Sequence, residues 1–278
     1  MHTCKPFEIG IDQARQLNLQ ILIGTLHPDL GETLALIRED MEWLKCRFGE
    51  GDTAAVLAKA RACGFTVCAP RGKALTQEEI GRALSWVLDL TLPTAIYQLP
   101  QVTQNEIGAD LAANLAQRYE NFMFFKDTSG SDAVVLSGKR LDGVFTARGA
   151  EGHYARWLKV GGGPYDGFLL ASANCFAKEL QHMIADISAG RLDAARRLSD
   201  GLTAAVGDVM RLVSGLPYGN PFANANKAID HFLAYGPGAA KRPTLRLHAG
   251  VSLPIELIRS TAEILKREQL MPIKGYLE

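Results

Sequence analysis

Residues 122–130 read FMFFKDTSG, an apolar run that ends in a lysine, an aspartate and small polar residues. Four consecutive apolar residues, followed soon after by Gly130, predict a short strand that is buried on both faces and ends in a turn. Strands buried on both faces are typical of parallel sheets, which helices cover on each side. Because parallel strands need a crossover between them, the pattern of apolar run and helix has to recur along the chain.

Similar apolar runs occur on both sides of this stretch, and helical patterns separate most of them. The predicted strands are 19–25, 65–69, 94–98, 122–126, 143–147 and 167–171. The predicted helices among them are 7–18, 31–46, 53–62, 104–119 and one that opens with the capping pattern Thr76-Gln77-Glu78-Glu79. Strands that alternate with helices in this way predict parallel βαβ units and an α/β fold.

From residue 174 onward the pattern is helical only, with predicted helices at 174–188, 192–214, 222–234 and 253–267. We therefore predict a (β/α) barrel core over residues 1–173 and a C-terminal helical region over residues 174–278 that packs on the barrel. A closed (β/α)8 or TIM barrel requires eight strands. Six are predicted, two fewer than a closed barrel needs.

Composition excludes several classes of protein. The chain has 278 residues, 47% of them hydrophobic, with 30 Lys and Arg against 30 Asp and Glu. This is ample for a core and argues against disorder. A net charge of zero argues against a broad surface for nucleic acid or anionic membrane. No stretch resembles a signal peptide or a transmembrane span, so we predict a cytoplasmic protein.

Neither cysteine nor histidine follows a metal-binding pattern. The five cysteines are scattered and lack CxxC spacing, so we interpret them as free thiols: Cys4, Cys46, Cys63, Cys68 and Cys175. The six histidines are isolated, with no HxH or HExxH arrangement. We therefore predict no metal site.

Lys126 is the strongest candidate for chemistry. Active sites of parallel α/β folds lie at the carboxyl ends of the strands, which is where Lys126 falls. A lysine next to Phe and Met residues is partly desolvated, which disfavours its charged form. A neutral amine is a nucleophile for ketones. The alternative is a surface lysine at a strand end that pairs with Asp127.

Tyr97 is the second candidate. It ends the preceding predicted strand, in Ile96-Tyr97-Gln98-Leu99-Pro100, and lies one βαβ unit before Lys126. The two residues are therefore expected at corresponding positions on neighbouring strands, about 5 Å apart. A phenol at that position can relay a proton. The alternative is a buried tyrosine with a hydrogen-bonded hydroxyl.

Four segments in order resemble the N-acetylneuraminate lyase and dihydrodipicolinate synthase family of pyruvate-dependent class I aldolases. They are Tyr-x-x-Pro at 97–100, Lys-Asp-Thr-Ser-Gly at 126–130, GVFTARG at 143–149 and DGFLLASAN at 166–174. The resemblance covers residues 60–190 approximately. It implies a TIM barrel with a C-terminal helical extension, assembled as a homo-oligomer, a tetramer or a dimer. If residues 19–25 are the third strand of that barrel, the barrel is incomplete at its N-terminus, and a missing N-terminal segment is favoured over strands supplied by a partner or an open barrel.

The resemblance also implies the chemistry. Lys126 would form a Schiff base with C2 of pyruvate or another small 2-oxo acid, and Tyr97 would relay protons. The backbone near Gly149 and Leu169 would border the keto acid. The iminium is an electron sink, so it permits aldol cleavage, aldol addition or dehydration without a metal or an organic cofactor. Glu151 could contact substrate, although a solvated helix face explains it equally well.

Two segments depart from the family pattern. Of its Gly-Thr-Thr-Gly-Glu loop, which holds the substrate carboxylate, only Thr3 in Met1-His2-Thr3 lies where the end of the loop would fall. Val102 stands where dihydrodipicolinate synthases carry an arginine. We therefore predict a Schiff-base-forming lyase of unassigned substrate. The alternative is a catalytically impaired, N-terminally truncated member that binds a 2-oxo acid or acts as a scaffold.

Overall fold

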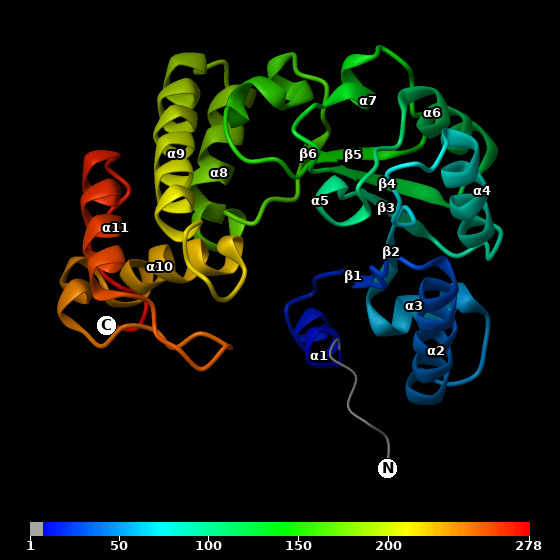
Figure 1. Cartoon of the computed structure of the whole chain (residues 1–278), viewed down its shortest axis with the longest axis horizontal. Helices are drawn as coiled ribbons and strands as arrows, with labels where there is room; N and C mark the ends of the chain where they lie inside the picture. The colour runs from blue at the N-terminus through cyan, green and yellow to red at the C-terminus, as the bar shows by residue number, and fades with distance from the viewer. Residues whose placement is uncertain (1–7) are drawn as a thin grey trace. The chain divides into compact units, whose positions relative to one another are not determined.

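The computed structural model describes residues 8–278 and consists of two compact units, Met1–Ala147 and Arg148–Glu278 (Figure 1). The first unit holds α1 (Glu8–Gln16), β1 (Ile21–Gly24), α2 (Leu30–Phe48), α3 (Thr53–Ala60), β2 (Ala62–Cys68), α4 (Gln77–Leu88), β3 (Thr94–Gln98), α5 (Pro100–Thr103), α6 (Ala109–Arg118), β4 (Phe122–Asp127) and α7 (Ala133–Leu136). The boundary between the units falls inside β5 (Phe145–Arg148).

The second unit is mostly helical. It holds the 3-10 turns η1 (Tyr154–Trp157), η2 (Lys159–Gly161) and η3 (Pro237–Lys241), the short strand β6 (Gly167–Phe168), and the helices α8 (Ala173–Ser188), α9 (Leu192–Val213), α10 (Pro221–Tyr235) and α11 (Ile255–Arg267). Its core includes Phe176, Met183, Leu202, Phe232 and Ile258, which are contributed by all four helices. The helix α9 packs against α8, α10 and α11, so it is the centre of this unit.

The strands lie in the sheet in chain order, from β1 to β6. The pairs β1–β2, β2–β3 and β3–β4 are parallel. Cys68 pairs with Tyr97 and Tyr97 with Lys126, so these three residues form one row across β2, β3 and β4. The predicted α/β fold is confirmed at this level, as six strands that match part of a TIM barrel. Closure into an eight-stranded barrel stays a prediction.

The helices of the first unit cover the strands with apolar faces. Thr76 caps α4 through the predicted capping box with Glu79, each residue binding the backbone N–H of the other. Ile80 and Leu84 of α4 then share a core cluster with Phe65 of β2. A capped, amphipathic helix beside a buried strand is the unit that the sequence pattern predicts.

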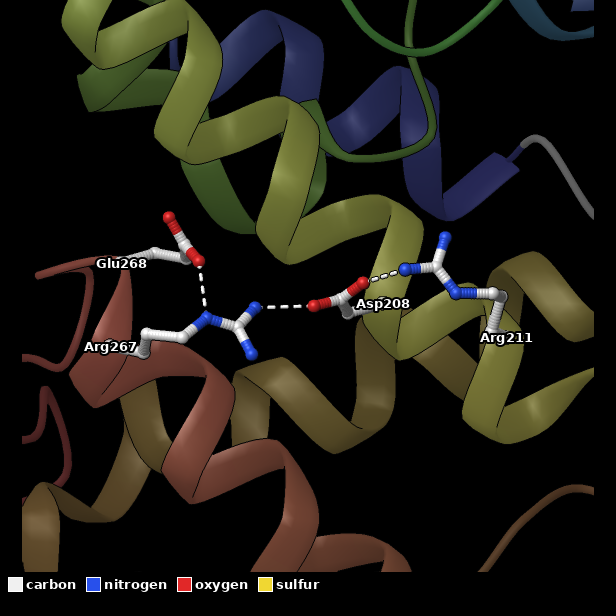
Figure 2. A network of polar contacts seen from close by, with 4 residues as sticks. All are labelled: Asp208, Arg211, Arg267 and Glu268. Carbon is white, nitrogen blue, oxygen red and sulfur yellow. Dashed lines mark hydrogen bonds and ion pairs between the residues drawn. The ribbon is translucent and has the colours of Figure 1, made fainter.

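Polar contacts also hold α9 to α11 in the second unit (Figure 2). The Asp208 carboxylate binds Arg211 on its own helix and Arg267 on α11. The Arg267 Nε donates to Glu268 at 2.6 Å. Both carboxylates raise the pKa of Arg267, which stays charged in any case.

Several element boundaries differ from the predictions, among them β6, which ends at Phe168 and not at residue 171. Strand β2 begins at Ala62, three residues before the predicted start at residue 65. The helix predicted over 104–119 is wrong at its start, because the chain forms α5 and α6 instead. Gln104 adopts a left-handed φ of 60° and ends α5, and Gly108 then begins α6 as its N-cap. The left-handed region is incompatible with a continuous helix.

The predicted division at residues 173 and 174 coincides with the start of α8, whereas the compact units divide at Ala147. The prediction of a barrel core and a separate helical region therefore stays a prediction. Over residues 8–278, none of the helices is both long and apolar enough to cross a membrane.

Candidate active site

Lys126 and Tyr97 lie side by side at the carboxyl ends of β4 and β3. They are direct partners in the sheet register, and the Lys126 Nζ is 4.1 Å from the centre of the Tyr97 ring. Both side chains are half-buried. The predicted placement of the two residues on neighbouring strands is therefore confirmed. An ammonium over the face of an aromatic ring is attracted to it, so this contact favours the observed position of the Lys126 side chain.

The segment after Lys126 forms a tight loop, and its side chains explain the Asp-Thr-Ser-Gly sequence. Asp127 is fully buried, and its Oδ1 accepts from the backbone N–H of Ser129 at 2.8 Å and from the Ser129 hydroxyl at 2.6 Å. The N–H and the hydroxyl of Thr128 both donate to the Gln98 carbonyl, at 3.2 and 2.7 Å. Gly130 has a φ of 75°, which favours glycine.

These contacts bear on the alternative in which Lys126 pairs with Asp127. Consecutive residues of a strand point to opposite faces of a sheet. Asp127 is buried while Lys126 is half-exposed. The Asp127 carboxylate shapes the loop through Ser129, and the Lys126 amine contacts Tyr97.

Gln98 and Gln101 tie the loop after β4 to the loop after β3. The Gln98 Oε1 accepts from the Ile107 N–H at 2.7 Å, and the Gln101 Nε2 donates to the Thr128 carbonyl at 3.2 Å. Among the described residues, the buried Gln98 Nε2 has no hydrogen-bond partner. Sequence reasoning did not assign either glutamine a role. The only signal for Gln98 is a polar residue at the end of an otherwise apolar strand.

Cys68 lies next to Tyr97 in the same row of the sheet, on β2. Its Sγ is 3.6 Å from the His27 carbonyl and is positioned to donate to it. Burial raises the pKa of the Cys68 thiol. A buried neutral thiol is a poor nucleophile at neutral pH. Of the nucleophilic side chains in this row, Lys126 is therefore the one suited to attack a carbonyl.

Gly149 and Leu169 belong to the second unit, where the Leu169 N–H donates to the Arg148 carbonyl at 3.0 Å. This bond places the chain after β5 beside the chain after β6. Gly149 is half-buried, and the Leu169 side chain is 44% exposed. Their predicted role beside the substrate stays a prediction. Thr3 lies outside the described residues.

Arg148 is a residue that sequence reasoning missed. It is only 5% exposed, and its Nη1 donates to the carbonyls of Ala150 and Gly152 at 2.7 and 3.0 Å. Its guanidinium lies 4.3 Å from the centre of the Trp157 ring. A charged residue that ends an apolar strand, just before Gly149, is the signal that could have identified it.

Of the two roles considered for Glu151, the structure contradicts the solvated helix face, while contact with substrate stays a prediction. Its carboxylate accepts hydrogen bonds from Tyr154 and Ser172, so it is not part of a solvated helix face. Among residues 8–278, no group of three or more His, Cys, Asp or Glu side chains is arranged to hold a metal ion.

Comparison with known proteins finds a matching family. The sequence model of the dihydrodipicolinate synthetase family matches residues 53–211, more than half of the chain and including Tyr97, Lys126, Gly149 and Leu169. A 4-hydroxy-tetrahydrodipicolinate synthase from Prosthecochloris aestuarii is 27% identical over 115 residues. That match spans 41% of this chain and 38% of the length of the relative.

Solved structures show the same fold. Dihydrodipicolinate synthase from Thermotoga maritima superposes with a TM-score of 0.65 at 17% identity, over 97% of this chain and 83% of that one. A prophage protein of the dihydrodipicolinic acid synthase family from E. coli K12, in complex with pyruvate, gives 0.64 at 18% identity over 94% and 78%. A 2-keto-3-deoxygluconate aldolase variant from Sulfolobus solfataricus gives 0.64 at 14% identity over 96% and 80%.

Proposed function

Because the chain belongs to the dihydrodipicolinate synthetase family, whose members are pyruvate-dependent lyases of the class I aldolase type, we propose that it is a Schiff-base-forming lyase. Its substrate in this proposal is pyruvate, a pyruvate-derived compound or another 2-oxo acid. One observation carries the proposal: the amine of Lys126 stands over the ring of Tyr97, on the adjacent strand, at the carboxyl ends of β3 and β4.

The proposed reaction begins when the Lys126 amine adds to the C2 carbonyl of the 2-oxo acid. The carbinolamine loses water to give an iminium, and Tyr97 relays the protons of this step. In the cleavage direction, the electron pair of the C3–C4 bond flows into the iminium, and the C4 hydroxyl loses its proton as the aldehyde leaves. The enamine then takes a proton at C3, and water releases the keto acid and regenerates the amine.

Several finer points belong to this proposal. Val102 is 36% exposed on α5 and offers no charge to the carboxylate of a second substrate. In this proposal the second substrate, or the product of cleavage, is therefore an aldehyde without a carboxylate beside Val102. A likeness to N-acetylneuraminate lyases in particular, assembly as a homo-oligomer and a cytoplasmic location stay predictions. A monomeric dihydrodipicolinate synthase variant is among the structures with this fold, so the assembly has to be measured by sedimentation.

Borohydride trapping tests the proposed function. Treatment of the protein with pyruvate and borohydride is expected to reduce the imine and leave a covalent adduct on Lys126, which peptide mass spectrometry locates. Lys126→Ala should abolish the adduct. Lys139→Ala is the matched control, since Lys139 is an exposed lysine of the same unit, paired with Asp110 at 2.5 Å, and its loss should leave labelling unchanged.

The alternative function predicts a different result. A member that binds a 2-oxo acid without chemistry would show pyruvate binding by calorimetry and no adduct. An unmodified Lys126 in folded protein therefore rejects the lyase proposal.

A further inference from the structure

Thr128 lies at the carboxyl end of the pairing between β3 and β4, two residues after Lys126. The register of the two strands ends where Gln98 pairs with Asp127. Thr128 follows this pair, and its backbone N–H donates to the Gln98 carbonyl at 3.2 Å. The Thr128 hydroxyl donates to the same carbonyl at 2.7 Å, so a side chain doubles the hydrogen bond at this end of the strands.

The segment after β3 holds Thr128 by a further bond. Gln101 on α5 donates from its Nε2 to the Thr128 carbonyl at 3.2 Å. Thr128 is half-buried, and a hydrogen bond that is partly shielded from water is electrostatically stronger than one in water. The N–H, the hydroxyl and the carbonyl of this one residue are therefore all bonded to residues 98–101.

These bonds adjoin the two residues that the proposed reaction uses, and all of them lie within the first unit. Tyr97 and Lys126 are partners in the sheet register, with the Lys126 Nζ 4.1 Å from the centre of the Tyr97 ring. The Gln98 carbonyl that accepts from Thr128 belongs to the residue directly after Tyr97. Because the ends of elements open most easily, a bond at this point restricts the backbone that carries Lys126.

We propose that Thr128 is a positioning residue of the lyase, whose hydroxyl holds the end of β4 against β3 and so keeps the Lys126 amine over the Tyr97 ring. The role rests on the proposed function, in which this amine attacks the keto acid. Thr128 makes and breaks no bond in that scheme, and it acts through the backbone of β4.

Two substitutions separate the Thr128 hydroxyl from the rest of the side chain. Thr128→Val is similar in shape and cannot donate, whereas Thr128→Ser keeps the hydroxyl and loses a methyl group. The main chain of Thr128 makes the other bonds to Gln98 and Gln101, so both variants can retain them. The loop also keeps the bonds from Ser129 to Asp127, and both variants are therefore expected to fold.

Thr94→Val is the matched control. Thr94 is the first residue of β3, and its hydroxyl donates to the Leu92 carbonyl at 2.7 Å, the same distance as in the bond of Thr128. The substitution removes an equivalent bond at the opposite end of the strand from Tyr97. A purely structural role predicts that Thr128→Val and Thr94→Val both lower Tm and leave the chemistry of Lys126 unchanged.

The experiment measures Tm and the exchange of pyruvate methyl protons in deuterium oxide, followed by proton NMR, for the wild type and the three variants. The iminium at C2 acidifies C3, which loses a proton to give the enamine and takes up a deuteron, so pyruvate alone reports on the Lys126 amine. In Thr128→Val, kcat for exchange should fall about tenfold with a smaller change in KM, because small misplacement of a reacting group has large costs. Thr128→Ser and Thr94→Val should stay close to the wild type.

A spectroscopic measurement reads the position of Lys126 without any chemistry. The ring current of Tyr97 shifts the resonance of a methyl group placed over the ring. Reductive methylation of the lysines with carbon-13-labelled formaldehyde should therefore give a shifted Lys126 signal, assigned by its loss in Lys126→Arg. Thr128→Val should move this signal toward those of exposed lysines, and Thr94→Val should not.

Three results overturn the positioning role while the lyase proposal stands, provided that borohydride still traps pyruvate on wild-type Lys126. They are a kcat in Thr128→Val equal to that of the wild type, equal slowing by Thr94→Val, and a Thr128→Ser variant as slow as Thr128→Val. A wild type that neither traps nor exchanges rejects the lyase instead. An Nζ-methyl signal that stays unchanged in Thr128→Val then rejects the positioning of Lys126 as well.

Discussion

Lys126 and Arg148 are both cations at the carboxyl ends of consecutive strands, β4 and β5, yet the two side chains have opposite surroundings. Arg148 is 5% exposed, and its guanidinium donates to two carbonyls and covers the Trp157 ring. Lys126 is half-buried over the Tyr97 ring, and among residues 8–278 its amine has no hydrogen bond or ion pair.

The difference teaches which of two similar residues is available for chemistry. A guanidinium whose donors are occupied by main-chain carbonyls stabilises a loop, and it does not lose its proton in proteins. An amine whose donors are not bound to protein can exchange its proton and attack a carbonyl. Aromatic contact is common to both sites, so the hydrogen-bond partners make the distinction.

The largest expected effect comes from replacing Lys126 by arginine, the cation found at position 148. Lys126→Arg keeps a positive charge over Tyr97 but cannot form an imine. Turnover of a 2-oxo acid substrate should fall at least about 10³-fold, and borohydride trapping should disappear. Tm should change little, which circular dichroism measures. Retention of trapping at another lysine in this variant would contradict the assignment of Lys126.

The reciprocal change tests the structural site. Arg148→Ala leaves the carbonyls of Ala150 and Gly152 without these donors, so the free energy of unfolding should fall by about 3 kcal/mol. Arg148→Lys should recover less than half of this loss, because an ammonium lacks the fork of donors. Urea unfolding measures both. A change below about 0.5 kcal/mol, typical of surface sites, would show that Arg148 is not a structural cation.

Tyr97→Phe separates the contribution of the Tyr97 ring from that of its hydroxyl beside Lys126. The ring under Lys126 remains, while the proton relay is lost, so kcat should fall about 10²-fold. Trapping of the imine at equilibrium should survive, and steady-state kinetics beside a trapping assay distinguishes the two steps. Equal kcat for the two proteins would limit Tyr97 to its aromatic contact with Lys126.

The smallest expected effect concerns Tyr154, whose hydroxyl donates to Glu151 in the second unit. Burial, followed by the negative charge of Glu151, raises the pKa of Tyr154 above its ordinary value of 10. The unfolded chain therefore ionises first, and stability that is complete below pH 10 is lost as the pH rises above it. Tyr154→Phe should cost about 1 kcal/mol at pH 7 and should weaken this alkaline loss. Urea unfolding between pH 8 and 11 measures it; parallel curves for the two proteins would exclude Tyr154 as the cause.

Sequence patterns predicted the fold to the level of individual strands. All six predicted strands are present, and the row that joins Tyr97 to Lys126 follows from their spacing of one βαβ unit. The capping box at Thr76 is also visible in the sequence, because its two residues are three positions apart. The break between α5 and α6 was not predicted, since Gln104 carries no signal for its left-handed conformation.

The residues of the candidate site also fall into two groups, those that the sequence identified and those whose roles needed the structure. Lys126 and Tyr97 are recognisable because they end apolar strands within short motifs, and side-chain periodicity acts over a few residues. Gln98 and Glu151 were not given their roles, since each binds a residue outside its own segment, Ile107 and Ser172 respectively. Arg148 binds carbonyls two and four residues ahead, but its burial depends on the fold around it.

The sequence by itself determined the order of the elements, the adjacency of Tyr97 and Lys126, and the family to which these motifs point. Only the tertiary structure decided that the Lys126 amine lies over the Tyr97 ring with no hydrogen bond or ion pair to residues 8–278, that Arg148 is buried, and that Glu151 binds Ser172. The physical reason is distance along the chain. Turns, caps and amphipathic faces are set by near neighbours, whereas the burial of Arg148 and the bond from Ser172 to Glu151 require segments that only folding brings together.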